Sequence, residues 1–250
     1  MDFHLSCASL SLRGLADVIE SIPESFSGWQ IVAEGRHNLR SVSAEFRDIA
    51  GSYSFDFTVH APFSDINIAS LNKAIRLSSV TEIADCIRAG ADLGLQKFVI
   101  HPGMHSVLSS ADRERAFLLS RESIKALSSL AESTGVELFV ENMAGKDAIG
   151  TTPRELRLLL SGTKTGICLD ISHAALEGQL VAFSAEERVV GMVHISDNDG
   201  SRDTHARIGS GKLELGGAVQ LLKKLGLPAV IEAGSVEDAI HGMNAVSSML

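Results

Sequence analysis

The chain has 250 residues, enough for one large domain with a sizeable core or for two small domains. Hydrophobic residues make up 45% of the chain and charged residues 21%, which excludes disordered and fibrous proteins. The 22 Lys and Arg residues against 31 Asp and Glu residues leave a net charge of −9. This balance gives no global basic surface for a polyanion, although a local patch could still bind one.

No apolar run approaches the ~18 residues that a membrane span needs. The chain begins Met1-Asp2-Phe3-His4, which is unlike the basic and apolar start of a signal peptide. Its three cysteines are scattered and odd in number, as suits a reducing compartment. We therefore expect a cytoplasmic protein with no membrane partner and no disulfide framework. Association into a homo-oligomer stays open.

Short β-rich apolar runs recur along the chain, and helical segments separate them. Strands are expected, in chain order, at 2–8, 29–34, 55–60, 96–101, 136–141, 166–170, 191–195 and 228–232. The clearest amphipathic segments, with apolar residues three and four apart, are 79–93, 112–134, 215–225 and 235–249.

Three glycines, Gly94, Gly135 and Gly226, stand between a helical segment and the next strand, where a left-handed C-cap is favoured. Eight strand–helix units of about 31 residues each match the size of a βαβ repeat. Alternating strands and helices indicate a parallel sheet, and eight units indicate a single (β/α)₈ TIM barrel of the α/β class over residues 1–250. The alternative is an open doubly wound sheet, but no GxGxxG follows the first strand.

Ligand-type side chains stand at the ends of six consecutive predicted strands. A TIM barrel builds its active site at the carboxyl ends of its strands. The residues at or just beyond these ends are His60, His101, Glu141, Asp170, His194 and Glu232, with His173 and the Asp203-Thr204-His205 triplet close behind. Imidazoles and carboxylates are ligands of divalent ions such as Zn²⁺ and Mn²⁺, and several buried carboxylates need cations to neutralise them. The pattern predicts a centre that holds one to three divalent ions.

Each of these residues also has an ordinary structural interpretation. A lone strand-end histidine is more often hydrogen-bonded or exposed than a ligand, and a lone Asp or Glu is usually an ion-pair partner or a helix cap. His4, His105 and His241 serve as controls within the chain and are left out, and His37 is kept only as a pocket candidate. The metal hypothesis rests on the presence of a ligand-type residue at the end of each of six consecutive predicted strands.

At these motifs the chain resembles the xylose isomerase-like metal barrels, a family that includes sugar epimerases and endonuclease IV. The matching pieces follow in order from about residue 55 to 235: His60-Ala61-Pro62-Phe63 with Ile66-Asn67-Ile68-Ala69-Ser70, His101-Pro102-Gly103, Glu141-Asn142-Met143-Ala144-Gly145, Cys168-Leu169-Asp170-Ile171-Ser172-His173, His194-Ile195-Ser196-Asp197, Asp203-Thr204-His205 with Gly209-Ser210-Gly211, and Ile231-Glu232. Single pieces are weak, but seven in order are specific.

Two branches of this family compete. The resemblance to endonuclease IV implies three zinc ions held by nine residues, namely His60, His101, Glu141, Asp170, His173, His194, Asp203, His205 and Glu232. The resemblance to sugar isomerases and epimerases implies one divalent ion held by the subset Glu141, Asp170, His194 and Glu232, with the other residues as substrate contacts. All nine residue types are present, which permits the nuclease without proving it.

Three features favour the sugar branch. The run from Trp29 to Gly35, with Glu34 near its end, resembles the second strand of the sugar enzymes, and the connection from His194 to Asp203 is short. No basic cluster interleaved with aromatic residues is present for DNA. Against this, Phe63 stands where the nuclease has an aromatic residue that probes DNA, although a phenyl ring can equally wall a sugar pocket.

For the sugar branch the resemblance implies metal-stabilised enediolate chemistry on a sugar or sugar phosphate. Glu141 and Glu232 would act as the acid/base pair while ligating the metal, and His173 would donate to a substrate oxygen. We expect further substrate contacts from Phe63, Trp29, Glu34, His37, Arg202 and Arg207; either arginine has an equally simple interpretation as a solvated loop charge. Under the alternative the protein would be a zinc-dependent DNA-repair phosphodiesterase that cleaves abasic DNA. A third hypothesis is a non-catalytic metal- or sugar-binding barrel.

Overall fold

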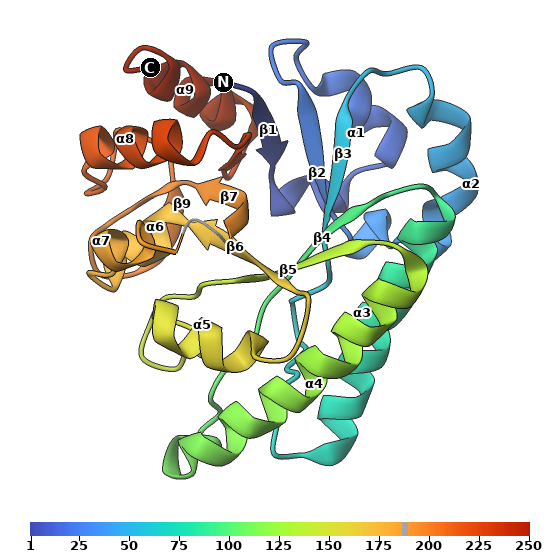
Figure 1. Cartoon of the computed structure of the whole chain (residues 1–250). Helices are drawn as coiled ribbons and strands as arrows, with labels where there is room; N and C mark the ends of the chain where they lie inside the picture. The colour runs from blue at the N-terminus through green and yellow to red at the C-terminus, as the bar shows by residue number, and fades with distance from the viewer. Residues whose placement is uncertain (187–189) are drawn as a thin grey trace.

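Eight parallel strands close into a barrel in the computed structural model, which describes residues 1–186 and 190–250. Neighbouring strands follow one another in chain order, and the last strand pairs with the first (Figure 1). The fold is therefore the expected single (β/α)₈ TIM barrel, and the open doubly wound sheet is excluded. The barrel strands are β1 (Phe3–Ser6), β2 (Gly28–Val32), β3 (Asp56–His60), β4 (Lys97–Ile100), β5 (Glu137–Glu141), β6 (Gly166–Asp170), β7 (Val190–Ile195) and β10 (Ala229–Glu232).

Helices surround the barrel, and α9 at the end of the chain packs beside β1 (Figure 1). The α-helices among the described residues are α1 (Leu15–Ser21), α2 (Leu39–Ala50), α3 (Lys73–Asp92), α4 (Arg113–Thr134), α5 (Pro153–Leu160), α6 (Ile171–Leu176), α7 (Leu180–Phe183), α8 (Leu215–Leu225) and α9 (Val236–Ser247). Short 3₁₀ turns are η1 (Ala8–Leu12), η2 (Gly35–His37) and η3 (Ser109–Ala111).

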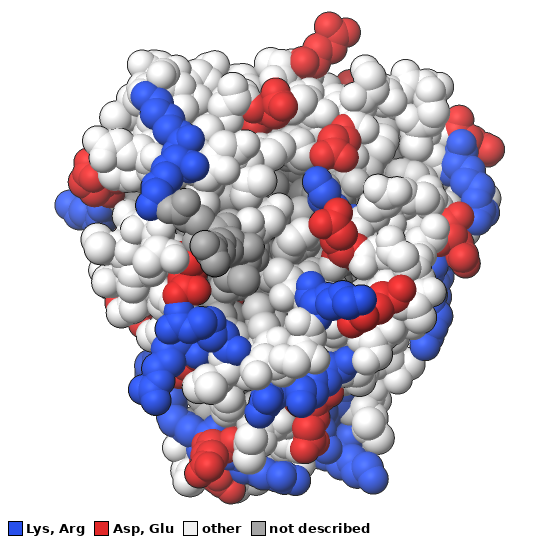
Figure 2. Space-filling model, viewed as in Figure 1, with Lys and Arg blue, Asp and Glu red and all other residues white. Residues whose placement is uncertain are grey.

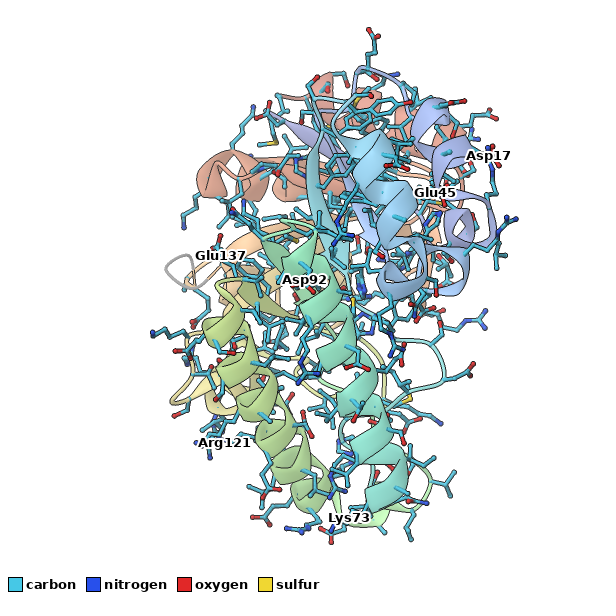
Figure 3. The ribbon with its side chains drawn as sticks, turned by 90° about the vertical axis from the view of Figure 1, so that its right-hand side faces the viewer. Asp17, Glu45, Lys73, Asp92, Arg121 and Glu137 are labelled. Carbon is cyan, nitrogen blue, oxygen red and sulfur yellow. The ribbon has the colours of Figure 1, made fainter. Side chains whose placement is uncertain are left out.

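The two longest helices, α3 and α4, lie side by side and project beyond the barrel (Figure 3). The predicted helix at 79–93 begins six residues earlier, at Lys73. The reason is the Asn72 side chain, which accepts hydrogen bonds from the backbone N–H groups of Ala74 and Ile75 and so caps the first turn. At the other end Gly94 has φ +80°, which agrees with the left-handed conformation predicted there.

A two-stranded antiparallel hairpin interrupts the regular alternation between β7 and α8. It consists of β8 (Asp197–Asn198) and β9 (Asp203–Ala206). The sequence pattern places a loop here and does not predict the hairpin, because its strands are too short to show a two-residue alternation.

The two-residue alternation of the strands places one layer of side chains directly above another inside the barrel. Five buried apolar residues form a cluster inside the barrel: Val99, Phe139, Cys168, Met192 and Val230. Two residues further along the same strands stand five of the predicted ligands: His101, Glu141, Asp170, His194 and Glu232. The apolar cluster is thus a floor beneath the ligand layer, and it closes the barrel below the site.

Residues of the opposite phase point outward and pack under the helices. Trp29 on β2 is one of them: its side chain is 1% exposed and its ring centroid lies 5.5 Å from that of His37, edge to face. Trp29 also meets Phe57 of β3, with ring centroids 6.4 Å apart. This placement differs from the expectation that Trp29 and His37 wall a sugar pocket; both belong to the layer between the barrel and its helices.

Acidic and basic side chains are interspersed on the face that Figure 2 shows, as the mixed composition leads one to expect. Of the helices in the described part of the chain, none combines the length and the apolar character that crossing a bilayer requires.

The outward position of Trp29 predicts a role in stability. We expect Trp29→Ala to lower the free energy of unfolding by about 3–5 kcal/mol, because it leaves a cavity under α2 that the surroundings fill only in part. Urea denaturation followed by far-UV circular dichroism measures this change, since the substitution removes the sole tryptophan. The control is Leu12→Ala, at a residue that is 73% exposed, where the change should stay within about 0.5 kcal/mol. A loss below about 1 kcal/mol in Trp29→Ala would contradict this packing role.

Candidate metal centre

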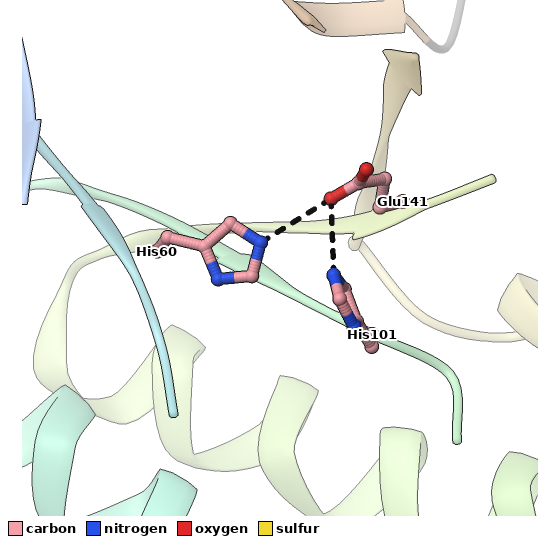
Figure 4. Close-up of side chains that lie close together, drawn as sticks. All are labelled: His60, His101 and Glu141. Carbon is pink, nitrogen blue, oxygen red and sulfur yellow. Dashed lines mark hydrogen bonds and ion pairs between the residues drawn. The ribbon is translucent and has the colours of Figure 1, made fainter. Parts of the chain in front are cut away.

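The carboxylate of Glu141 at the end of β5 lies at the centre of the site. One of its oxygens, Oε2, is 3.3 Å from Nε2 of His60 and 3.4 Å from Nε2 of His101 (Figure 4). The two histidines come from the ends of β3 and β4, the neighbouring strands. These three residues, called the side set, present ligand atoms within 4.8 Å of one another.

A second group, called the inner set, shares Glu141 with Asp170, His194 and Glu232. Its members end four adjacent strands, β5, β6, β7 and β10, and all are buried. Nδ1 of His194 lies 3.5 Å from Glu141 Oε2 and 3.3 Å from Glu232 Oε1. The four ligand atoms fall within 4.8 Å of one another, which is the spacing that one shared ion requires.

A third group, called the outer set, comprises His173, Asp203 and His205. Oδ2 of Asp203 is 3.1 Å from Nε2 of His173 and 2.9 Å from Nε2 of His205. Asp203 and His205 stand on the hairpin strand β9, and their side chains are 29% and 41% exposed. His205 has a φ of +44°, which is rare for a residue with a side chain and is found where function compensates strain.

Backbone carbonyl groups select the ring nitrogen that two of the histidines offer. Nδ1 of His60 donates to the Ala61 carbonyl at 2.9 Å, and Nδ1 of His173 donates to the Asn142 carbonyl at 2.8 Å. In each ring Nε2 is therefore the nitrogen that is directed at Glu141 or Asp203 and that could be offered to a metal ion. This arrangement is typical of histidines that ligate a metal through Nε2.

Several buried polar atoms of the inner set have no hydrogen-bond partner within the described part of the chain. They are Oδ2 of Asp170, Oε2 of Glu232 and both ring nitrogens of His194. Buried polar atoms are rarely left unsatisfied, because each costs about 1–3 kcal/mol. A divalent cation would satisfy Asp170 Oδ2 and Nδ1 of His194, the ring nitrogen that faces the carboxylates, so the donor set fits a metal ion.

The electrostatics of the inner set point the same way. Burial, helped by the charges of Glu141 and Glu232, raises the pKa of Asp170 to about 7. Burial also disfavours ionisation of Glu232, but protonated His194 beside it lowers the pKa of that carboxyl to about 2. Protonated histidines thus neutralise the carboxylates when no cation does.

The outer set shows the same compensation. Burial opposes the positive charge of His205, but the hydrogen bond that its ring donates to Asp203 and the charge of Glu232 overcome it and raise the pKa of His205 to about 9. The pKa of His173 is likewise raised, against burial, by Asp170 and Asp203. Both rings carry a proton at neutral pH that a metal ion would have to displace.

Cys168 is a further sulfur donor close to the inner set, since its Sγ lies within 4.8 Å of ligand atoms of Glu141 and His194. Burial raises the pKa of the Cys168 thiol to about 12, which disfavours the thiolate that binds metals. Cys168 is better described as part of the apolar floor.

Two residues with no ligand role in the sequence analysis hold the ligands in place. Asn142 accepts from the backbone N–H of Asp170 at 2.7 Å and donates to the Asp170 carbonyl at 2.9 Å, which ties the end of β5 to the end of β6. Asp197 lies at the base of the hairpin, 1% exposed. Its carboxylate accepts four backbone N–H bonds of 2.8–2.9 Å, from Asn198, Gly209, Gly211 and Leu213.

The Asp197 carboxylate therefore clamps both ends of the segment that carries two members of the outer set, Asp203 and His205. The clamp also explains the glycine at 211, where a Cβ atom would collide with the Asn198 carbonyl and with Asp197 Oδ1. Asp197 belongs to the His194-Ile195-Ser196-Asp197 motif, but its role as a clamp depends on hydrogen bonds to residues 12 to 16 positions further along the chain, which no local pattern reveals.

A cavity of about 140 Å³ opens above the ligands. Its walls include ligands of all three sets together with Phe63, Val32, Met143 and Ser6. Phe63 packs against His60 and His101, with ring centroids 4.9 and 5.0 Å apart, so it lies where a substrate contact is expected. Ser6 and Val32 end β1 and β2, and the strand-end rule would have found them had it not been limited to ligand-type residues.

The other expected substrate contacts lie outside this cavity. Glu34 accepts hydrogen bonds of 2.6 Å from the backbone N–H groups of Phe63 and Ser64, so it holds the Phe63 loop. Arg202 is 82% exposed beside Asp199, and Arg207 pairs with Asp238 and Glu237. Both arginines therefore match the solvated-loop interpretation.

The clamp predicts that Asp197→Asn selectively weakens the outer set, because an amide N–H₂ would face backbone N–H donors. After saturation with Zn²⁺ and dialysis, we expect the variant to retain less zinc than the parent protein, by at most the one equivalent that the outer set could hold, as measured by elemental analysis. Asp199→Asn, which changes only a surface turn of the same hairpin, should keep the zinc content of the parent protein. Equal zinc content in Asp197→Asn, with an unchanged melting temperature, would refute the clamp.

The raised pKa of His205 predicts that metal binding releases protons. Since this pKa is about 9 in the metal-free protein, the apparent zinc affinity should rise with pH up to about 9 and fall about tenfold per pH unit per proton below it. Calorimetric titrations with Zn²⁺ at pH 7, in buffers of different ionisation enthalpy, count the protons. On binding zinc, the His205→Gln variant should release fewer protons than the parent protein, and the His241→Gln variant should release the same number. Equal proton release from the parent protein and both variants would contradict the raised pKa of His205.

Comparisons with known proteins agree with this geometry. Residues 17–246 match the family model of the xylose isomerase-like TIM barrel. An uncharacterized protein of Methanocaldococcus jannaschii is 29% identical over 262 aligned positions, covering all of this chain and 89% of the relative. The probable endonuclease 4 of Mycobacterium leprae is 30% identical over 198 positions, covering 74% of this chain and 75% of the relative.

Among solved structures, a D-tagatose 3-epimerase-like protein superimposes with a TM-score of 0.89 at 28% identity. The superposition covers all of this chain and 97% of that protein. The family model covers most of the chain, and the closed barrel is the fold that its description names. The chain therefore belongs to the xylose isomerase-like TIM barrel family.

Proposed function

We propose that the protein is a divalent-metal-dependent isomerase or epimerase of a sugar or sugar phosphate. The observation that carries this proposal is the inner set, in which two glutamates, an aspartate and a histidine from four adjacent strands meet within 4.8 Å in a buried layer. The likeness to a D-tagatose 3-epimerase-like structure supports the same class of reaction.

Glu141 and Glu232 are the residues proposed to move the proton. Both face the cavity, and Oε2 of Glu232 has no hydrogen-bond partner in the described residues, so it is free to accept a proton from a carbon atom. The second glutamate would return a proton, from the other side for an epimerase. A divalent ion, when bound by the inner set, would polarise the substrate carbonyl and acidify the neighbouring C–H bond. Nε2 of His173 also borders the cavity and would contact a substrate oxygen.

The surroundings of the cavity suit proton transfer from carbon. The apolar floor closes the barrel below the ligands, and Val32, Phe63 and Met143 provide apolar walls. Such walls pack against the carbon skeleton of a sugar and keep bulk water from quenching the reaction.

A second candidate function is phosphodiester cleavage in abasic DNA. The observation in its favour is the presence of all three ligand sets, with Glu141 shared between two, because proton transfer at one ion does not need the side and outer sets. The likeness to a probable endonuclease 4 supports it as well. We rank it second because Arg202 and Arg207 are engaged with acidic neighbours and are not directed at a phosphate backbone.

The test is turnover by protein loaded with Zn²⁺, Mn²⁺ or Co²⁺, with a panel of ketoses and their phosphates in D₂O followed by NMR. We expect epimer formation or deuterium incorporation, and a loss of about 100-fold or more in Glu232→Gln, the low end of what acid–base catalysis contributes. The same variant should bind less metal and keep its circular dichroism spectrum. Glu237→Gln, at an 88% exposed residue, is the matched control and should behave like the parent protein.

A parallel assay with a duplex oligonucleotide that carries one abasic site decides between the candidates. Incision that disappears in Glu141→Gln, together with no change in any sugar of the panel, would replace the proposed function by the second candidate. Neither activity, in protein with full metal content, would favour the non-catalytic binding barrel.

A further inference from the structure

A second cavity of about 280 Å³ adjoins the metal cavity; we call it the side cavity. The two share Phe63, His101 and Met143 in their walls, so these side chains form the boundary at which they adjoin. The side cavity lies between the loops that follow β3, β4 and β5. Its remaining lining includes Ile66, Met104 and a stretch from Ala144 to Ala148.

The metal cavity is too small to hold a typical ligand alone. Small-molecule sites measure roughly 300–1,000 Å³, whereas this cavity measures about 140 Å³ and must also admit the ions. Together with the side cavity the volume falls within that range. A substrate that contacts the inner set therefore has room to extend past Phe63 and Met143 into the side cavity.

The side cavity differs in chemistry from the metal cavity. Four of its lining side chains are apolar: the thioethers of Met104 and Met143, the phenyl ring of Phe63 and the branched alkyl group of Ile66. The charged residues Lys146 and Asp147 also line it. Methionine sulfur and methyl groups adapt to flat or irregular apolar shapes and make favourable contacts with aromatic rings. The hydroxyl groups of a sugar would find few partners among the four apolar side chains, whereas an apolar or aromatic group would be well accommodated.

The loop that carries Met104 is held in place although the Met104 side chain is 56% exposed. The Asn67 side chain donates to the Met104 carbonyl at 2.8 Å and accepts from its N–H at 3.1 Å. Gly103 has a φ of +88°, and a Cβ atom there would lie 2.7 Å from Asn67 Oδ1. Met104 therefore presents its apolar side chain from a backbone that is held in one position at the wall of the side cavity.

We propose that the substrate is a sugar joined to an apolar or aromatic group, with the sugar at the inner set and the attached group in the side cavity. This inference rests on the proposed function and narrows its substrate class from free sugars to substituted sugars that keep a free carbonyl group, such as glycosides that carry a ketone on the ring.

The experiment compares methyl and phenyl glycosides of the same keto sugars, so that only the attached group differs and the carbonyl that the chemistry needs is kept. The protein is loaded with Co²⁺, whose visible spectrum reports a ligand at the metal, and the panel covers ring ketones derived from the common hexoses and pentoses. For sugars that bind, we expect phenyl glycosides to bind about tenfold tighter than their methyl partners, because the ring is removed from water. Equal affinities would overturn the proposal.

The six methionines of the chain provide a second, spatially resolved measurement. In zinc-loaded protein with ¹³C-labelled methionine methyl groups, phenyl glycosides should shift the Met104 signal and methyl glycosides should not. The buried Met192 and Met243 are internal references, since neither lines the side cavity. Tighter binding of phenyl glycosides without a shift at Met104 would place the ring elsewhere and refute the proposal.

Substitution at the cavity gives the matched control. Met104→Ser should remove most of the tenfold preference for the phenyl group and leave the affinity for methyl glycosides unchanged. Leu108→Ser, in the same loop but outside the side cavity, should keep the preference. If free ketoses are converted while no glycoside binds, the proposed function stands and this inference fails; if no sugar of any kind binds to metal-loaded protein, both fail.

Discussion

The molecule is organised around negative charge in a place that excludes water. Three carboxylates, from Glu141, Asp170 and Glu232, meet above an apolar floor, where like charges repel strongly. Protonated His194 and a raised pKa at Asp170 relieve this repulsion only in part. Leaving ligand atoms such as Asp170 Oδ2 without partners is destabilising in the metal-free fold, which is the usual cost of a preorganised site.

The outer contacts of the ligands serve this arrangement more than they serve general stability. Backbone carbonyls orient His60 and His173, and Asn142 joins the ends of β5 and β6. The inner and side sets are therefore carried by barrel strands, whereas the outer set depends on a hairpin that a single carboxylate, that of Asp197, holds closed. One cavity thus combines ligands fixed on barrel strands with ligands on a hairpin that a single substitution at Asp197 could loosen.

The barrel and the ligand residues could be predicted from the sequence because both follow from strand periodicity. Ligand-type residues at strand ends imply their own convergence, since parallel strands of a barrel end at one mouth. The prediction of substrate contacts was weaker. Residue type makes Trp29 a candidate wall of a sugar pocket, but its phase on β2 directs it outward. The acidic partners of Arg207 lie on α9, about 30 residues further along the chain, where no local pattern links them to it.

The features that sequence patterns did not predict depend on contacts between loops. The side cavity needs three separate loops, and its shape rests on the Asn67 hydrogen bonds to Met104. The clamp of Asp197 similarly joins positions that no short motif connects. The start of α3 is different, because Asn72 is an ordinary capping signal, and weighing it would have extended the predicted helix.

The two-layer interior also sets how the sequence can change by insertion and deletion. On β4, β5, β6, β7 and β10, each floor residue stands two positions before a ligand. Losing or gaining one residue within such a strand would therefore turn the ligand toward the helices and place an apolar side chain at the mouth. The connecting loops are free of this constraint. Length variation among relatives should therefore gather in the loops around the mouth, where it would reshape the cavities and leave the ligand layer intact.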